Sequence, residues 1–491
     1  MTQEEIVKIL KVGVLLSYER DLNRLLEEIL ACLMDLAHCD AGTLYLLDGD
    51  ALRFKIMRND TLQTYDGGDG KDPDLPPVPL RRENVCALSI IEDRTVRIED
   101  VYTSTECDFS GAARYDAITG YHTQSMLVVP LRNRQGQKLG VIQLLNALDR
   151  DGNICAFTED NALMLESVGS QAAITIQNVR YIEEIKDLFQ SFVRVMSSAV
   201  DERTPYNGSH TRHMVAYGER FLDYLNRLAR ARGEPERFVG DRREELLLSV
   251  WLHDIGKLVI PLGIMNKEGR MTPKQYTDFV HRMQVIRLRA EIDELKGKLT
   301  AEERQELVRQ THEAEELIAV CNSAGVLSEN RVAALDVLAA RTYEAEDGTF
   351  RPWLPPEEHR MMDIRKGTLS DEERAVMQDH VVVTSKLLGE INFPGEYAHV
   401  RDWASMHHEF LDGSGYPHGL RGEQIPVEVR IVTILDIFDA LTADDRPYKP
   451  GIPVEKALVI LDGMANREGK LDPELTRLFI ESRCWEQEGA P

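Results

Sequence analysis

Basic residues are scarce in this chain relative to acidic ones. Among 491 residues there are 58 Lys and Arg against 83 Asp and Glu, which gives a formal net charge of −25. A surface this negative repels the phosphate backbone of DNA and RNA, so general nucleic-acid binding is excluded from the expected functions. A small substrate that carries phosphate remains compatible, because bound metal ions can supply a local positive charge.

Long hydrophobic runs are also missing. No stretch approaches the ~18 uninterrupted apolar residues that a membrane-spanning helix requires. The first residues, MTQEEIVKIL, lack a basic region followed by an apolar run and a cleavage site, as a secretory signal would have. The sequence therefore predicts a cytoplasmic protein that makes no use of a membrane.

Cysteine is present but unpatterned. The seven cysteines are an odd number, lie scattered along the chain and form no Cys-x-x-Cys pair. This excludes a disulfide framework and a structural zinc site built on cysteine. Hydrophobic residues make up 43% and charged residues 29%, as in ordinary globular proteins. The length predicts between about two and four domains.

The N-terminal third alternates between helical and strand-like patterns. Apolar residues recur at helical spacing within residues 1–40, and a second helical pattern covers 159–185. Between them lie a loop-rich middle and short apolar or alternating runs typical of strands. These runs are 42–47, 51–57, 125–130 and 140–146. The order of elements predicts an α+β domain over residues 1–180.

Three stretches of this domain resemble the GAF family. They are TGYHTQSMLVVPL at 119–131, GVIQLLN at 140–146 and FTEDNALMLESVGSQAAITIQN at 157–178. The resemblance implies an antiparallel sheet flanked by helices and a sensory role. Family members that bind cyclic nucleotides carry Asn-Lys, Phe and Asp-Glu, where this chain has Asn146-Ala147, Phe157 and Glu159-Asp160. A small-molecule ligand of unknown identity and a fold used only for dimerisation and signal relay both remain open.

Residues 181–200 predict a linker helix with one apolar seam. The seam residues are Ile182, Ile185, Phe189, Phe192 and Met196, spaced 3, 4, 3 and 4 apart. This spacing is typical of a short parallel coiled coil, so we expect a homodimer. The alternative is a helix that packs on its own domain. A sensor helix that runs directly into a second domain would offer a mechanical path for regulation.

Residues 201–491 form the expected second domain. Within it, residues 283–345 are rich in Glu, Arg, Leu and Ala, as in RLRAEIDELKGKLTAEERQELVRQ. This composition predicts a helical hairpin that turns near Lys298–Thr300, inserted in the domain and without chemistry of its own.

The first chemical motif is LHDIGKLVIP at 252–261. His253 and Asp254 are adjacent in a stretch that reads as helical up to Gly256. Adjacent residues on a helix diverge by ~100°, so the two side chains suit a shared pair of metal ions better than chelation of one ion. Lys257 lies one helical turn beyond His253 and is expected on the same side.

Two further motifs add histidine and carboxylate. His407 and His408 stand in ASMHHEFLDGSGYPHGL, and Asp436 stands in the apolar stretch ILDIFDALTADDRPYKP. A carboxylate in apolar surroundings needs a partner, and a metal ion is one. Imidazole and carboxylate ligands suit Fe, Mn or Zn. Two ions ~3.5–4 Å apart would clamp a phosphoester, with a metal-bridged hydroxide attacking phosphorus.

Together these motifs resemble the HD-GYP family of phosphohydrolases. The matching residues are HDIGK, then HHE-x-x-DG-x-GYP-x-GL-x-G-x-x-I at 407–425, then D-x-F-DALT-x-x-x-RPYK at 436–449. The resemblance implies an all-helical domain that hydrolyses cyclic di-GMP to pGpG and GMP. It also implies iron or manganese, although the ligand chemistry alone admits zinc. Metal ligands carried over by motif are His210, His253, Asp254, His380, His407, His408 and Asp436.

Two of these assignments have competitors. His210 lies in TPYNGSHTRHM, where Ser209 and Thr211 depart from the family's Gly and Ser, and His213 follows one turn later. The family's later ligand histidine matches either His380, in RKGTLSDEERAVMQDH, or His281, in NKEGRMTPKQYTDFVH. His380 is preferred because it follows a good helix-capping pattern and leads directly into the His-His-Glu motif.

The resemblance also implies how many metal ions are bound and which residues contact the substrate. Some members hold a third ion through an acidic residue four positions before the first histidine, where this chain has Tyr206, so we expect two ions. Asp254 and Lys257 are the expected catalytic residues, with Lys257 contacting the scissile phosphate or the leaving oxygen. Expected substrate contacts are Lys257, Tyr416, Pro417, Arg446 and Lys449. Glu409 is expected to orient a ligand histidine.

Three functions remain open on the sequence alone. The first is a phosphodiesterase for cyclic di-GMP. The second is a sensor or scaffold without turnover, whose GYP loop docks a GGDEF-type protein as in the family. The third is a phosphodiesterase for another cyclic dinucleotide. Base selectivity depends on the shape of the pocket, which the motifs do not specify.

Overall fold

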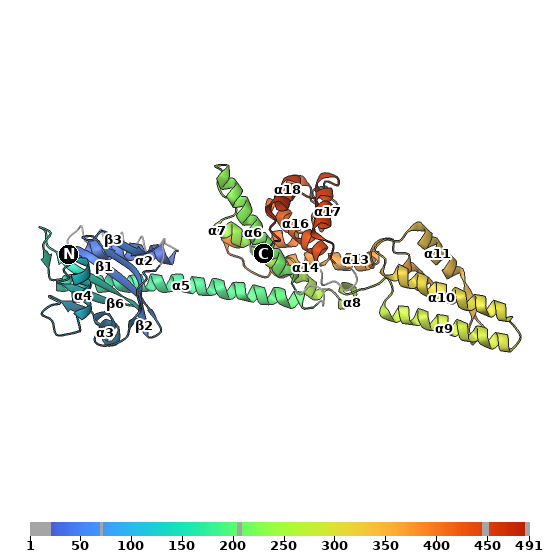
Figure 1. The fold of residues 1–491 in the computed structure, drawn as a ribbon, viewed down its shortest axis with the longest axis horizontal. Coiled ribbons are helices and arrows are strands. Elements are labelled where there is room, and N and C mark those ends of the chain that lie inside the picture. The colour runs from blue at the N-terminus through green and yellow to red at the C-terminus, as the bar shows by residue number, and fades with distance from the viewer. Residues whose placement is uncertain (1–20, 69–71, 204–208, 444–450, 487–491) are drawn as a thin grey trace. The chain divides into compact units, whose positions relative to one another are not determined.

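A computed structural model of the chain describes residues 21–68, 72–203, 209–443 and 451–486 (Figure 1). Contacts between residues divide the chain into two compact units, with the boundary between Phe189 and Gln190. Over the described ranges, no helix combines the length and apolar character needed to cross a membrane.

The first unit is built on one antiparallel sheet with the strand order β3-β2-β1-β7-β6-β5, in which β4 pairs with β2 and β8 with β7. The strands are β1 Cys39–Asp48, β2 Ala51–Asn59, β3 Thr64–Gly67, β4 Val78–Pro79, β5 Val96–Ile98, β6 Met126–Arg132, β7 Lys138–Leu148 and β8 Ile154–Cys155. All four runs expected as strands lie in β1, β2, β6 and β7, so the α+β prediction is confirmed.

Each face of this sheet has its own apolar core. Alternate residues of a strand point to opposite faces, so Leu44 packs with helices α2 (Leu22–Ala37) and α5 (Glu159–Asp201), while Tyr45 packs with α3 (Val85–Glu92). The segment expected to be loop-rich contains α3, β5 and α4 (Ser110–Thr119). Most of the segment is loop, as expected, but α3 was not predicted because its sequence, VCALSIIE, is apolar on nearly every side and shows no helical period. The helical pattern before residue 21 lies outside the described residues.

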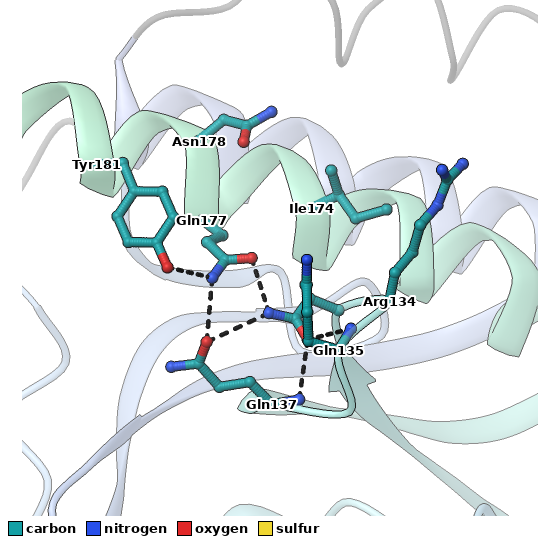
Figure 2. A pocket seen from close by; sticks show the side chains of 8 residues that line it. Arg134, Gln135, Gln137, Ile174, Gln177, Asn178 and Tyr181 are labelled. Carbon is teal, nitrogen blue, oxygen red and sulfur yellow. Dashed lines mark hydrogen bonds between the residues drawn. The ribbon is translucent and has the colours of Figure 1, made fainter.

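Helix α5 is continuous over 43 residues and so includes the predicted linker. Near its middle it is bound to the β6–β7 turn by side-chain amides (Figure 2). Asn133 Nδ2 donates to Gln177 Oε1 at 2.8 Å, and Gln177 Nε2 donates to Gln137 Oε1 at 3.0 Å and to Tyr181 Oη at 2.7 Å. The same residues line an open pocket of about 510 Å³. This network anchors α5 to the sheet of the first unit.

The second unit is mainly helical, as predicted. Its framework consists of α6 His210–Ala231, α7 Gly240–Leu252, α8 Leu262–Met265, α13 Asp371–Gln378, α14 His380–Leu388, α15 Val400–Ser405, α16 Val427–Thr442, α17 Val454–Asn466 and α18 Pro473–Ser482. Short 3-10 helices are η1 Ile255–Val259, η2 Gly395–Tyr397 and η3 Gly422–Gln424. Helix α16 is buried along much of its length, and its Phe438 packs among residues such as Phe221 and Phe479 in the largest core of this unit.

An inserted module occupies the middle of the second unit. It contains α9 Pro273–Leu295, α10 Ala301–Ser323, α11 Glu329–Ala340, β9 Thr342–Glu344, β10 Phe350–Pro352 and α12 Pro356–Met362, with an apolar core of its own. The expected turn near Lys298–Thr300 falls between α9 and α10. The module extends beyond 283–345 at both ends, and its two-stranded sheet departs from an all-helical domain.

The two ends of this module lie side by side. Buried Arg270 donates to the carbonyl oxygens of Ile364 at 2.8 Å and of Cys321 and Ala324 at 2.6 Å each. Lys267 Nζ contacts Glu373 Oε2 at 2.6 Å. The chain therefore leaves the helical framework and returns at nearly the same place, with residues of the two competing sequence copies side by side.

Candidate metal centre

The His-Asp pair lies where helix α7 ends. The helix stops at Leu252, four residues before the predicted end, and His253 is its C-cap residue. After Asp254 the chain forms the 3-10 helix η1. In that tighter helix, residues three apart eclipse one another, so Lys257 Nζ lies 2.5 Å from Asp254 Oδ2. The expected alignment of Lys257 with His253 is thus replaced by a contact with Asp254.

The two oxygens of Asp254 face two different sets of histidines. Oδ2 lies 3.2 Å from His253 Nε2 and 3.8 Å from His210 Nε2. Oδ1 lies 3.5 Å from His380 Nε2 and 4.0 Å from His407 Nε2. This is the arrangement that a carboxylate shared between two metal ions requires.

The candidate ligand atoms fall into two groups that match this division. Among the described residues, His210, His253 and Asp254 form one group, and His380, His407 and His408 form the other, with ligand atoms within 4.8 Å of one another in each. Asp436 adds a second carboxylate, with Oδ1 3.4 Å from His210 Nε2 and Oδ2 3.7 Å from His408 Nδ1.

Hydrogen bonds orient four of the histidine rings. The Nδ1 atoms of His253, His380 and His407 each lie 2.7 Å from a backbone carbonyl three residues earlier. Nδ1 of His210 lies 2.6 Å from Asp439 Oδ2. Such partners place the proton on Nδ1 and leave Nε2 as the ligand atom, as in most metal-binding histidines.

Within the part of the chain that the structure describes, two buried polar atoms at the centre have no hydrogen-bond partner. They are Nε2 of His253 and Oδ1 of Asp254, in side chains that are 0% and 4% exposed. A buried polar atom without a partner is costly, and a metal ion would satisfy both. The donor set of imidazole and carboxylate therefore fits divalent transition metals.

The electrostatics of the site also suit metal binding. Burial together with His408 lowers the pKa of His407 well below its ordinary value, and burial lowers the pKa of His408 to about 4. Burial opposes ionisation of Asp254, but His253 and Lys257 outweigh it and hold the pKa of Asp254 well below its usual range. The neutral imidazoles of His407 and His408 and the ionised carboxylate of Asp254 are in the protonation states that metal ligands need.

Close backbone packing fixes the His-Asp turn against α14. The Thr384 hydroxyl accepts a hydrogen bond from Gly256 N at 3.0 Å and donates to His253 O at 3.1 Å. A Cβ atom on Gly256 would lie 1.9 Å from His380 O. Only glycine at position 256 permits the backbone of the His-Asp turn to lie this close to the backbone of α14. On the other side, Thr433 of α16 donates to His407 O at 2.8 Å.

The loop after the second histidine pair folds back onto it. The Tyr416 ring lies 4.8 Å from the His408 ring, centroid to centroid, and Tyr416 N donates to His408 O at 3.1 Å. Glu409 accepts from His418 N at 2.7 Å and from Leu420 N at 2.8 Å. The expectation that Glu409 orients a histidine was wrong, because backbone amides of this loop occupy both of its oxygens.

Comparisons with known proteins agree with both units. A family model described as the GAF domain matches residues 21–176, and one described as the HD domain matches residues 354–475. The chain carries a GAF domain followed by an HD domain. The His-Asp pair at 253–254 lies outside the segment that the HD model matches.

Two curated relatives resemble part of the chain. The 3′3′-cGAMP-specific phosphodiesterase 3 of Vibrio cholerae is 38% identical over 110 residues, which cover 22% of this chain and 23% of that protein. A cyclic di-GMP phosphodiesterase of Thermotoga maritima is 35% identical over 119 residues, 24% of this chain and 31% of that protein. The matched segment thus spans less than a third of either relative.

Among solved structures, the GAF domain from an Acinetobacter phosphoenolpyruvate-protein phosphotransferase aligns with 38% of this chain and 99% of its own length. Its sequence identity is 15% and the TM-score is 0.28.

The structure brings all seven candidate metal ligands of the HD domain together. His213 lies outside the cluster, with its side chain 53% exposed and its Nδ1 3.4 Å from Asp439 Oδ1. His281 lies on α9 in the inserted module. Tyr206, Arg446 and Lys449 lie outside the described residues, so their expected roles stay predictions.

Sequence reasoning missed the residues that support the ligands. Thr384 and Thr433 bind backbone carbonyls of ligand residues through hydroxyl groups, and no motif marks them. Asp439 stands in the D-x-F-DALT motif, three residues after Asp436 on the same helix, but the motif did not indicate that its carboxylate would bind Nδ1 of His210.

Proposed function

We propose that the HD domain is a divalent-metal-dependent phosphodiesterase that hydrolyses cyclic di-GMP to pGpG or GMP. The observation that carries this proposal is the Asp254 carboxylate, whose two oxygens face two histidine groups. The printed names of the two curated relatives, both cyclic-dinucleotide phosphodiesterases, support the substrate class. The proposed ions are two Fe or Mn, held by the seven residues of the cluster.

The chain's own residues would prepare the site for phosphoester cleavage. When bound, the ions supply Lewis acidity toward the phosphate and toward the attacking water. Asp254 and Asp436 hold the two halves of the centre together. Burial disfavours the charged form of Lys257, but Asp254 raises the pKa of Lys257 above its ordinary value. Its protonated Nζ is therefore a donor for a phosphate oxygen.

The GYP loop would form one wall of the substrate site. Tyr416 lies against His408 and is followed by Pro417, so a guanine base that stacks there would stand next to the metal centre. A Cβ atom on Gly415 would come within 2.6 Å of three backbone atoms of residues 408–410. The loop is thus held close to the ligand pair. Arg446 and Lys449 complete the proposed set of substrate contacts.

A mixed cyclic GMP-AMP is a second candidate substrate. It is favoured by the relative from Vibrio cholerae, whose printed name specifies 3′3′-cGAMP. Both dinucleotides present the same phosphodiester to the centre, so the proposed chemistry is unchanged.

The test is turnover of both dinucleotides by protein purified without oxygen. We expect about two Fe or Mn ions per chain. We also expect cyclic di-GMP to be converted to pGpG or GMP, with the products separated and measured by chromatography. Removal of metal with a chelator should abolish turnover, and added Mn²⁺ should restore it. Faster hydrolysis of cyclic GMP-AMP would reassign the substrate. Metal binding with no turnover of either would favour a sensor or a scaffold that docks a GGDEF-type partner.

We further propose that the GAF domain regulates this activity in a homodimer joined along α5. Ile182, Ile185 and Phe192 of the predicted seam are 55%, 65% and 60% exposed. Neighbouring Leu188 and Val195 widen this apolar strip. A solvent-exposed strip with coiled-coil spacing is what a second copy of α5 would cover.

The double variant Ile185→Asp, Phe192→Asp is expected to be monomeric. Dimerisation would bury two unpaired carboxylates of each chain in a short coiled coil, and the free-energy cost of removing them from water is too high. Size-exclusion chromatography with light scattering should give the mass of two chains for the wild type and of one for the variant. Arg194→Asp, on the opposite side of the heptad, is the control and should remain dimeric. A dimeric double variant would refute the α5 interface.

A further inference from the structure

The last turn of α5 is hydrogen-bonded to the segment that carries His210. Asp201, the final residue of α5, is 3% exposed, and its Oδ1 accepts from Thr211 Oγ1 at 3.1 Å. Ser198 Oγ accepts from Arg212 Nη2 at 3.2 Å. Both donors directly follow the candidate ligand His210. The end of α5 therefore holds the first turn of α6.

The residue two positions beyond α5 binds the other ligand segment. Arg203 Nη1 donates to Lys257 O at 2.8 Å and also contacts Leu258 O, while Nη2 donates to Ile260 O at 3.3 Å. These carbonyls belong to η1 and its C-cap, directly after Asp254. A guanidinium at this position supplies hydrogen-bond donors to the carbonyl groups at the C-terminal end of the 3-10 helix.

Packing leaves the end of α5 little freedom to move independently of the centre. Val193, Ser197 and Val200 are each no more than 5% exposed, on the face that continues to Asp201. A displacement or rotation of this turn must therefore be passed on, through Asp201 to His210 and through Arg203 to Asp254. The same helix is anchored to the GAF sheet through Gln177.

We propose that Asp201 and Arg203 are positioning residues that set the distance between His210 and Asp254 and thereby couple α5 to the metal centre. Neither belongs to the ligand set. The inference rests on the proposed function to the extent that the centre binds metal. It identifies the end of α5 as the place where a change in the GAF domain would alter metal binding before it alters substrate binding.

The test measures Mn²⁺ binding by the full chain, by calorimetry, with Asp201→Ala, Thr211→Val and Arg203→Met. We expect a ~10–100-fold loss of affinity for one ion, the range found when outer partners of metal ligands are removed. The electron paramagnetic resonance signal should change from that of a coupled Mn²⁺ pair to that of isolated Mn²⁺. Thr211→Ser should restore wild-type binding, because it keeps the hydroxyl.

Glu202→Gln is the matched control, since this exposed residue between Asp201 and Arg203 should leave Mn²⁺ binding unchanged. Circular dichroism and the melting temperature of the metal-free proteins show whether each variant is folded. Should Arg203→Met fail to fold, Arg203→Lys loses the forked contact and provides the same comparison. Folded variants with wild-type Mn²⁺ binding would overturn the coupling. A wild type that binds no Mn²⁺ would instead refute the proposed function.

Discussion

Asp254→Asn is expected to lower kcat for cyclic di-GMP by ~10³-fold or more, the scale of losing a group that organises charge in the transition state. It should also reduce bound Mn²⁺ from two ions per chain to one or fewer. The amide keeps the size of the carboxylate but removes its charge and one of its two acceptor atoms. Because the two oxygens of Asp254 face different histidine groups, no single replacement atom can serve both.

Stopped assays with chromatographic separation of products, together with metal analysis of dialysed protein, measure both effects. Asp379→Asn is the matched control. Asp379 is exposed and lies next to His380, so the same change of charge near the centre should leave kcat within about twofold. An Asp254→Asn variant that keeps two ions and wild-type kcat would rule out the shared-carboxylate centre.

Gly256→Ala is expected to destabilise the second unit by about 3 kcal/mol or more, the upper range for overpacking a tight interior site. The added Cβ would lie 1.9 Å from His380 O and 2.7 Å from Thr384 N. Both contacts are with backbone atoms, which cannot rotate away as a side chain could. Relief requires the His-Asp turn to move from α14, so Mn²⁺ affinity should fall at the same time.

Thermal unfolding and Mn²⁺ titration of the purified variant measure these two consequences. Gly263→Ala is the control, since a Cβ at that position in α8 meets nothing within 4 Å. It should be neutral or slightly stabilising, because alanine lowers the entropy of the unfolded chain. Equal melting temperatures for the two variants would show that α14 does not hold the turn as closely as the structure indicates.

Several features of the protein could be read from the sequence alone. Short apolar runs marked the long strands of the GAF domain, because a strand buried on both faces of a sheet has few polar positions. The short helix α3 escaped notice, because eight mostly apolar residues contain too little contrast to reveal a period. The clustered histidines and aspartates pointed to His253, Asp254, His407, His408 and Asp436, and the resemblance to the HD-GYP family added His210 and His380; the structure brings all seven together.

Other features depended on tertiary structure. The sequence contained both His210 and His213, and both His281 and His380, and local spacing favoured one of each pair without showing where any of them lies. The structure separates them, because His281 belongs to a module with its own core and His213 faces solvent. The sequence predicted the insertion, and the structure adds that its two ends lie side by side, with Lys267 Nζ 2.6 Å from Glu373 Oε2.

The sequence by itself determined which chemical groups are available: five histidines and two carboxylates suited to divalent metals. Only the tertiary structure decided how they meet, with Asp254 between the two groups, Asp439 behind His210 and the end of α5 against both ligand segments. The physical reason is distance along the chain. His210 and Asp439 are 229 positions apart, and the packing of α6 on α16, rather than any local pattern, brings their side chains within 2.6 Å.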